Sequence, residues 1–174
     1  MRTKYRPCAR QLTGSRQGFT LVEALVAVII IGLGAAAIMV SAASNTRAND
    51  TGSKLTDAVF LGQELREWTL GLPFTDPDPG DQGNPPGSDG SDPQDFVDDL
   101  DDLMGVTYAP PRDGSGAAIS GMPGWSQTIN MTWRDPDDLT SVVADGASNI
   151  IYVEVTLSFE STAVMETGWL VAER

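Results

Sequence analysis

The residues whose types and spacing could do chemistry are carboxylates. Ten aspartates and no basic residue lie between residues 76 and 102. Glycine, proline and asparagine alternate with them, and such a turning acidic segment can supply the six to eight oxygen ligands that Ca²⁺ takes. The spacing does not fit the EF-hand pattern, so a solvated loop extended by charge repulsion is the alternative interpretation. The candidate calcium ligands are Asp76, Asp78, Asp81, Asn84, Asp89 and Asp92.

Most other site chemistry is excluded by composition. The 174 residues include no histidine and one cysteine, Cys8. Serine–histidine and cysteine–histidine catalysis is therefore excluded, as are metal sites with histidine ligands. Paired carboxylates such as Asp98 and Asp102 lie in turn-rich sequence without an evident apolar pocket to raise a pKa. We expect no enzymatic activity and no cofactor, with calcium as the one candidate ion.

Positive charge is concentrated at one end of the chain. Five of the 11 basic residues precede Gly18, so residues 19–174 carry the other 6 against 24 acidic residues, a net charge of −18. Proteins bind a phosphate backbone through basic side chains, so this balance disfavours such contact. We expect no direct binding to nucleic acid.

An apolar segment follows the basic N-terminus. Residues 24–46 contain no charged side chain. About twenty helical residues span the hydrocarbon core of a bilayer, and basic residues that flank a membrane helix stay in the cytoplasm. The segment predicts a single-pass inner-membrane protein with a cytoplasmic N-terminus and a periplasmic C-terminal domain.

The junction between the basic and apolar segments carries the most specific motif. It reads Arg-Gln-Gly-Phe-Thr-Leu-Val-Glu over residues 16–23. This string, followed at once by an uncharged run, resembles the processing site of type IV pilins and of the related pseudopilins of type II secretion. The resemblance implies that residues 1–18 are a leader peptide, that prepilin peptidase cuts between Gly18 and Phe19, and that Phe19 is then N-methylated.

Glu23 stands where this family carries an acid used in assembly. A carboxylate at the edge of a bilayer is costly unless it is paired, so Glu23 is a functional candidate on physical grounds as well. The resemblance implies that Glu23 pairs with the N-terminal amine of a neighbouring subunit as a filament grows. The implied partners are prepilin peptidase, other pilins or pseudopilins, an inner-membrane assembly platform and the lipid bilayer.

Two departures from the family pattern disfavour a major type IV pilin and leave the pseudopilins open. Val40 stands where major pilins have a helix-breaking proline, and no cysteine is present for their C-terminal disulfide loop. The run Glu-Ala-Leu-Val-Ala-Val over residues 23–28 resembles the minor subunits more than the major ones. The resemblance therefore implies a minor pseudopilin or minor pilin, placed in a periplasmic type II secretion pseudopilus or a surface type IV pilus.

Two other interpretations of the apolar segment stay open. As a secretory signal peptide it would be cleaved near Ser41-Ala42-Ala43, although its apolar region is longer than usual and begins with an acid. As a plain anchor it would hold a periplasmic binding module, with calcium as a candidate ligand, that does not polymerise.

Residues 47–72 have the periodicity of an amphipathic helix that continues the transmembrane helix of residues 19–46. Residues 49–53 are poor helix sequence, where the helix could bend or break. Gly71 and Pro73 indicate its end. The apolar residues recur every three or four positions, at Leu55, Ala58, Leu61, Leu65, Trp68 and Leu72.

Residues 73–124 predict an acidic loop region. They include 9 glycines and 9 prolines, too many for long regular elements. One short helix is expected near residues 93–104, because Asp92-Pro93 is typical of a helix start and Leu100 and Leu103 would share a face.

Alternating polarity predicts an antiparallel sheet over residues 125–174, with runs at 125–134, 150–160 and 163–172. One face of the first run holds Trp125, Ile129, Met131 and Trp133. A single apolar face requires a cover, and the helix at 47–72 can supply it. The expected fold class is α+β and pilin-like: a long N-terminal helix, membrane-spanning in its first half, packed on a small C-terminal antiparallel β-sheet.

Overall fold

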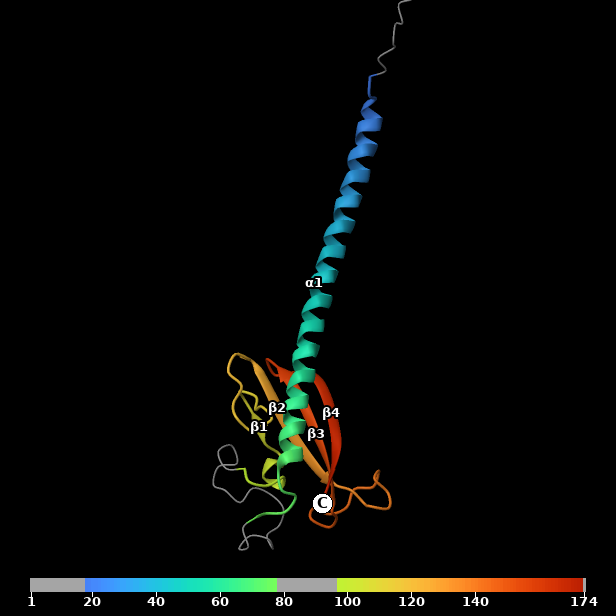
Figure 1. The fold of residues 1–174 in the computed structure, drawn as a ribbon. Helices are drawn as coiled ribbons and strands as arrows, with labels where there is room; N and C mark the ends of the chain where they lie inside the picture. Colours follow the sequence, from blue (N-terminus) through green and yellow to red (C-terminus); the bar gives the residue numbers. More distant parts are fainter. Residues whose placement is uncertain (1–17, 78–96, 174) are drawn as a thin grey trace, which may run out of the picture. The chain divides into compact units, whose positions relative to one another are not determined.

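The computed structural model describes residues 18–77 and 97–173 (Figure 1). The chain divides into two compact units, Met1–Arg47 and Ala48–Arg174. Helix α1 (Leu21–Gly71) contributes to both units, and every β-strand belongs to the second. The α+β, pilin-like fold class predicted from the sequence is confirmed.

Within the first unit, α1 is apolar on every side. Its most apolar window of 18 residues has a mean hydropathy of 2.6, and none of that window is buried. Among the described residues this is the one helix long and apolar enough to cross a membrane. A helix that is hydrophobic all round and uncovered needs an apolar environment outside its own fold. This supports single-pass anchoring in a membrane.

Residues 49–53, the weak point of the predicted helix, are helical, so no break interrupts α1 there. A local ion pair supports the helix there. Lys54 forms an ion pair of 3.0 Å with Asp50 one turn earlier. Ion pairs at this spacing stabilise a helix by a few tenths of a kcal/mol, which helps to offset the weak helix propensity of Gly52.

In the described part of the chain, four antiparallel strands form the sheet in the order β1-β2-β3-β4. They are β1 (Thr107–Tyr108), β2 (Trp125–Trp133), β3 (Ile150–Phe159) and β4 (Thr162–Ala172). The sheet begins earlier than predicted, because β1 lies in the region expected to be loop. Two residues are too few for an alternating pattern to indicate a strand. They pair with Thr128 and Gln127 of β2.

The core lies between one face of the sheet and the second-unit part of α1, which crosses that face (Figure 1). Ala58, Leu61 and Leu65 of α1 are fully buried, as are alternate residues of β3 from Ile151 to Leu157. Gly62 allows the helix to approach β4 closely, since a Cβ there would lie 3.3 Å from Met165 Cε.

The short helix expected at residues 93–104 is wrong over its described part. Residues 97–100 are not helical, and Asp101–Leu103 form a single 3₁₀ turn. The apolar residues still face inward, because Leu100 and Leu103 are fully buried. Aspartate side chains accept hydrogen bonds from backbone N–H groups in this segment, which favours turns over a regular helix. Residues 93–96 lie outside the described residues.

Gln127 is a buried polar residue that the apolar pattern of β2 did not reveal. Its side chain is fully buried. Its amide nitrogen donates to the carbonyls of Leu61 and Arg112, both at 3.1 Å, and its amide oxygen accepts from the Arg112 N–H at 2.7 Å. One side chain therefore joins β2 to α1 and to the segment that follows β1.

Candidate functional site

The first described residues show how the N-terminal motif begins α1. Residues 18–20 are not helical, and the helix starts at Leu21. The Thr20 side-chain oxygen accepts a hydrogen bond of 3.2 Å from the Glu23 N–H. The Thr20 carbonyl accepts from Ala24 at 3.1 Å. Thr20 is therefore the N-cap of α1, and Glu23 is the third helical residue, as in a capping box.

This geometry gives Glu23 a defined setting. As the acidic residue of the first turn, it lies where exposed N–H groups and the helix dipole favour negative charge. Its side chain is exposed, so its carboxylate is accessible to a partner. A charge at the start of an apolar helix is retained at low energetic cost only if something compensates it.

The predicted cleavage site lies immediately before this helix. Gly18 and Phe19 are outside α1, and the Phe19 side chain is 77% exposed. Exposed segments outside regular structure are the preferred sites of proteolysis, and Gly18 and Phe19 have this character. Cleavage there would leave a new amine one residue before the Thr20 cap.

The candidate calcium ligands lie mostly beyond the description. Of the six, only Asp76 is in the described part of the chain; Asp78, Asp81, Asn84, Asp89 and Asp92 lie outside it. Calcium binding at residues 76–92 therefore stays a prediction.

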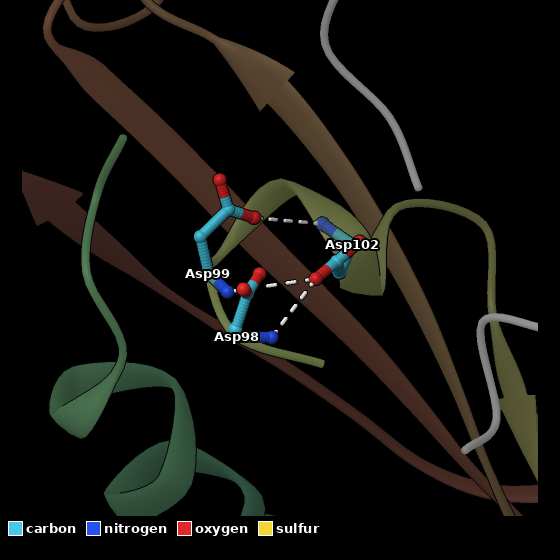
Figure 2. Close-up of side chains that lie close together, drawn as sticks. All are labelled: Asp98, Asp99 and Asp102. Atoms are coloured by element: carbon cyan, nitrogen blue, oxygen red, sulfur yellow. Dashed lines mark hydrogen bonds between the residues drawn. The ribbon is translucent and has the colours of Figure 1, made fainter. Parts of the chain in front are cut away.

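A second group of carboxylates comes together in the fold as a metal candidate, although the spacing of its residues in the sequence did not indicate one. Figure 2 shows Asp98, Asp99 and Asp102, whose nearest side-chain oxygens all lie within 4.8 Å of one another. Asp99 and Asp102 are 3% and 1% exposed. Asp102 Oδ2 accepts from the Asp98 N–H at 3.0 Å, and Asp99 Oδ1 accepts from the Asp102 N–H at 3.2 Å. Three carboxylates supply only part of a calcium shell of six to eight oxygens.

Burial, followed by neighbouring carboxylates, favours protonation of Asp98 and Asp99. Burial, then the hydrogen bond and charge of Asp101, raise the pKa of Asp99 to about 8. The pKa of Asp98 is also raised, by burial and by the charges of Asp102 and Asp76. Like-charged carboxylates in contact disfavour the ionised form, so a bound proton or a bound cation would each stabilise the cluster.

Asp99→Asn is expected to weaken the pH dependence of stability. A carboxyl whose pKa is raised on folding contributes stability below the unfolded pKa of about 4, and this contribution is lost as pH rises through the folded pKa. For Asp99 that window extends from about pH 4 to about pH 8. The amide keeps an oxygen for the Asp101 and Asp102 N–H groups, so the variant should unfold several degrees higher than wild type at pH 8 and no higher at pH 4.

The measurement is thermal unfolding of the full-length chain in detergent across this pH range. A calcium chelator is present, because Ca²⁺ on these carboxylates would oppose their protonation. Asp145→Asn, in an exposed turn, is the matched control and should leave the pH profile unchanged. Parallel wild-type and Asp99→Asn profiles would contradict the assignment.

Comparison with known proteins identifies one region of the chain. Residues 14–39 match the family described as the prokaryotic N-terminal methylation motif. The matched range includes Gly18, Phe19 and Glu23. No curated protein and no solved structure matches the chain.

Proposed function

We propose that the chain is a minor structural subunit of a type II secretion pseudopilus or a type IV pilus. The premise is the methylation motif of residues 14–39, which marks a type IV pilin-like precursor processed by prepilin peptidase. Its N-terminal helix anchors the precursor in the inner membrane with the second unit in the periplasm. After cleavage the same helix enters the filament.

The observation that carries the proposal is the position of Glu23. It lies in the first turn of a helix that carries no further charge until Arg47, four residues after Phe19, and its side chain is exposed. Within one filament, the new amine on Phe19 of a neighbouring subunit would compensate the Glu23 carboxylate. In such a pair the carboxylate and the amine compensate each other, so neither charge is left unpaired in apolar surroundings.

Charge supports a minor subunit over a major one. Residues 19–174 carry a net charge of −18. A filament made of many copies would bring these like-charged domains together, and their mutual repulsion would oppose assembly. A single copy among less acidic subunits avoids this cost. A subunit present in few copies is therefore the arrangement that the charge favours.

Replacing Gly18 is expected to stop processing of the precursor. Gly18→Val places a β-branched side chain directly before the predicted scissile bond. The control is Gly14→Val, which changes another glycine of the same leader. We expect wild type and Gly14→Val to begin at N-methylated Phe19, and Gly18→Val to begin at Met1. Intact mass and N-terminal sequencing of each chain, recovered from membranes of cells that make prepilin peptidase, give the result.

Other N-termini would favour the alternatives. A wild-type chain that begins at Ser44 would be an ordinary secreted protein, and Glu23 would have no role in it. A wild-type chain that begins at Met1 would be a plain membrane anchor, and a binding module that does not polymerise would become the better description.

A further inference from the structure

The two edges of the sheet differ in how their backbone groups are used. On the β1–β2 edge, loop residues form hydrogen bonds with the backbone N–H and C=O groups of β2 that the short strand β1 does not reach. The Gly105 N–H donates to the Ile129 carbonyl at 3.1 Å, and the Ile129 N–H donates to Val106 at 2.9 Å. The Val143 N–H donates to the Trp133 carbonyl at 3.0 Å. This edge is closed by the chain itself.

Strand β4 forms the opposite edge (Figure 1). It is 11 residues long, and in the described part of the chain no strand pairs with its outer side. Its sequence contains no proline or lysine, and Glu166 is its single charged residue. Proteins usually protect a long edge strand with such residues or by covering it. Residues 166–172 of β4 therefore form an edge that a further strand can pair with.

The phase of the ladder shows which residues present their backbone to this open edge. The Glu173 N–H donates to the Asn149 carbonyl at 3.0 Å, and the next pair is Ile150 with Ala172. Hydrogen-bonded and non-hydrogen-bonded pairs alternate in an antiparallel ladder. The even-numbered residues of this part of β4 therefore point their N–H and C=O groups away from β3. They are Glu166, Gly168, Leu170 and Ala172.

The apolar core also continues up to this edge, where α1 covers it only in part. The inward side chains of β3 are at most 1% exposed from Ile151 to Leu157. Their partners on β4 are all half-buried, including Met165, Trp169 and Val171. A further strand beside β4 would place its own inward side chains against this row and complete the burial.

Helix α1 supplies a second wall for such a strand. Gly62 faces Met165 and Thr167 of β4. Leu55 and Val59 lie on the preceding turns of that side of α1, and they are 48% and 46% exposed. Residues 70–75, at and after the end of α1, and residues 170–173 enclose an open groove of about 640 Å³. Alternate side chains of an extended segment beside β4 could pack on the apolar surface of α1 and fill this groove.

We propose that the outer edge of β4 receives an extended strand from a different subunit of the same filament, in antiparallel or parallel pairing along residues 166–172. This inference rests on the proposed function. Glu166 and Glu173 flank the edge, so the incoming strand carries neutral or basic side chains opposite them. A second copy of this acidic chain is disfavoured by the repulsion described above.

Hydrogen exchange at single-residue resolution tests the edge directly. The full processed chain is measured alone in detergent at several dilutions, and then in filaments isolated from the cell envelope together with those released from the cell surface. We expect the amides of Glu166, Gly168, Leu170 and Ala172 to exchange rapidly in the isolated chain, and to exchange at least about a hundredfold more slowly in filaments. The odd-numbered amides of β4, already bonded to β3, should be protected in both samples.

Each other outcome overturns the inference in a distinguishable way. Rapid exchange of the even-numbered amides in filaments would leave the proposed function standing and remove the strand pairing. Slow exchange at every dilution would mean that the chain covers its own edge. Slow exchange only in the concentrated isolated chain would identify a second copy as the occupant. Absence of the chain from filaments would remove the proposed function, and this inference with it.

A backbone variant provides the second test. Leu170→Pro removes an outward N–H without removing a bond to β3, and its matched control Leu170→Thr changes the side chain but keeps the N–H. We expect Leu170→Pro to enter filaments at least about tenfold less than wild type, and Leu170→Thr to enter within about twofold of it. Equal incorporation of the two variants, at equal amounts of processed chain in the membrane, would contradict the pairing.

Discussion

Glu23→Gln is expected to remove the chain from filaments while its cleavage, N-methylation and membrane insertion continue. Glutamine keeps the size of the side chain and a hydrogen-bonding oxygen, and the Thr20 cap of α1 uses the backbone N–H of residue 23, which the substitution retains. What is lost is the negative charge that compensates a neighbouring amine. Loss of one partner from a buried ion pair typically costs about 3–5 kcal/mol, so incorporation should fall by about a hundredfold or more.

The experiment compares the amount of each variant in filaments, isolated both from the cell envelope and from the cell surface, with the amount of processed chain in membranes. Asp145→Asn, which removes one negative charge from an exposed turn, is the matched control and should assemble as wild type does. Wild-type levels of Glu23→Gln in filaments would contradict the pairing role. A wild-type chain that reaches the cell envelope but enters no filament would instead favour the binding module.

Gln127→Glu is expected to cause the largest loss of stability among single isosteric changes in the second unit. The glutamine amide nitrogen donates to two carbonyl oxygens, of Leu61 and Arg112. A carboxylate would place a negative oxygen against both of them at a fully buried position. We expect a loss on the order of 3–5 kcal/mol at neutral pH, the usual cost of an uncompensated buried charge.

The pH dependence distinguishes this charge effect from lost hydrogen bonds. Burial would raise the pKa of the introduced carboxyl, so the destabilisation should be lowest below about pH 4 and should grow as pH rises. Even at low pH about 1–3 kcal/mol is lost, because the single O–H of the protonated carboxyl replaces only one of the two N–H donors. Gln127→Leu removes the same hydrogen bonds without a charge, and should lose about 1–3 kcal/mol with little dependence on pH. Denaturant unfolding of the full-length chain in detergent at pH 4 and pH 7.5 provides the comparison.

Gln63→Glu is the surface control for this pair. It makes the same chemical change on the exposed side of α1, one turn before Glu67. The expected loss is below about 1 kcal/mol. A similar loss for Gln63→Glu and Gln127→Glu would show that burial of residue 127 is not the cause.

Features carried by contiguous residues could be predicted from the sequence. The uncharged run after Glu23 indicated the membrane helix, and the string around Gly18 indicated the processing motif that the comparison with known families then found. Strict alternation indicated β2 and β3, because successive side chains of a strand point to opposite faces. The roles of Gly18, Phe19 and Glu23 are predictions that the experiments above test.

Features that depend on distant parts of the chain were settled only by tertiary structure. The side chain at position 127 of β2 points into the core. A glutamine is tolerated there only because its amide nitrogen donates to the carbonyls of Leu61 in α1 and of Arg112. The two residues of β1 form a strand because β2 offers them an edge.

The buried carboxylate cluster and the open edge of β4 also depend on tertiary structure, and the sequence did not indicate either. Burial of Asp99 and Asp102 arises from the fold, because a run of aspartates alone indicates a solvated loop. Which edge of the sheet stays open depends on which loops return to it, and those at 105–106 and 143 return to β2. Local sequence thus determined the elements and the N-terminal motif. Long-range hydrogen bonding and burial decided which polar groups are enclosed and which strand remains available to a partner.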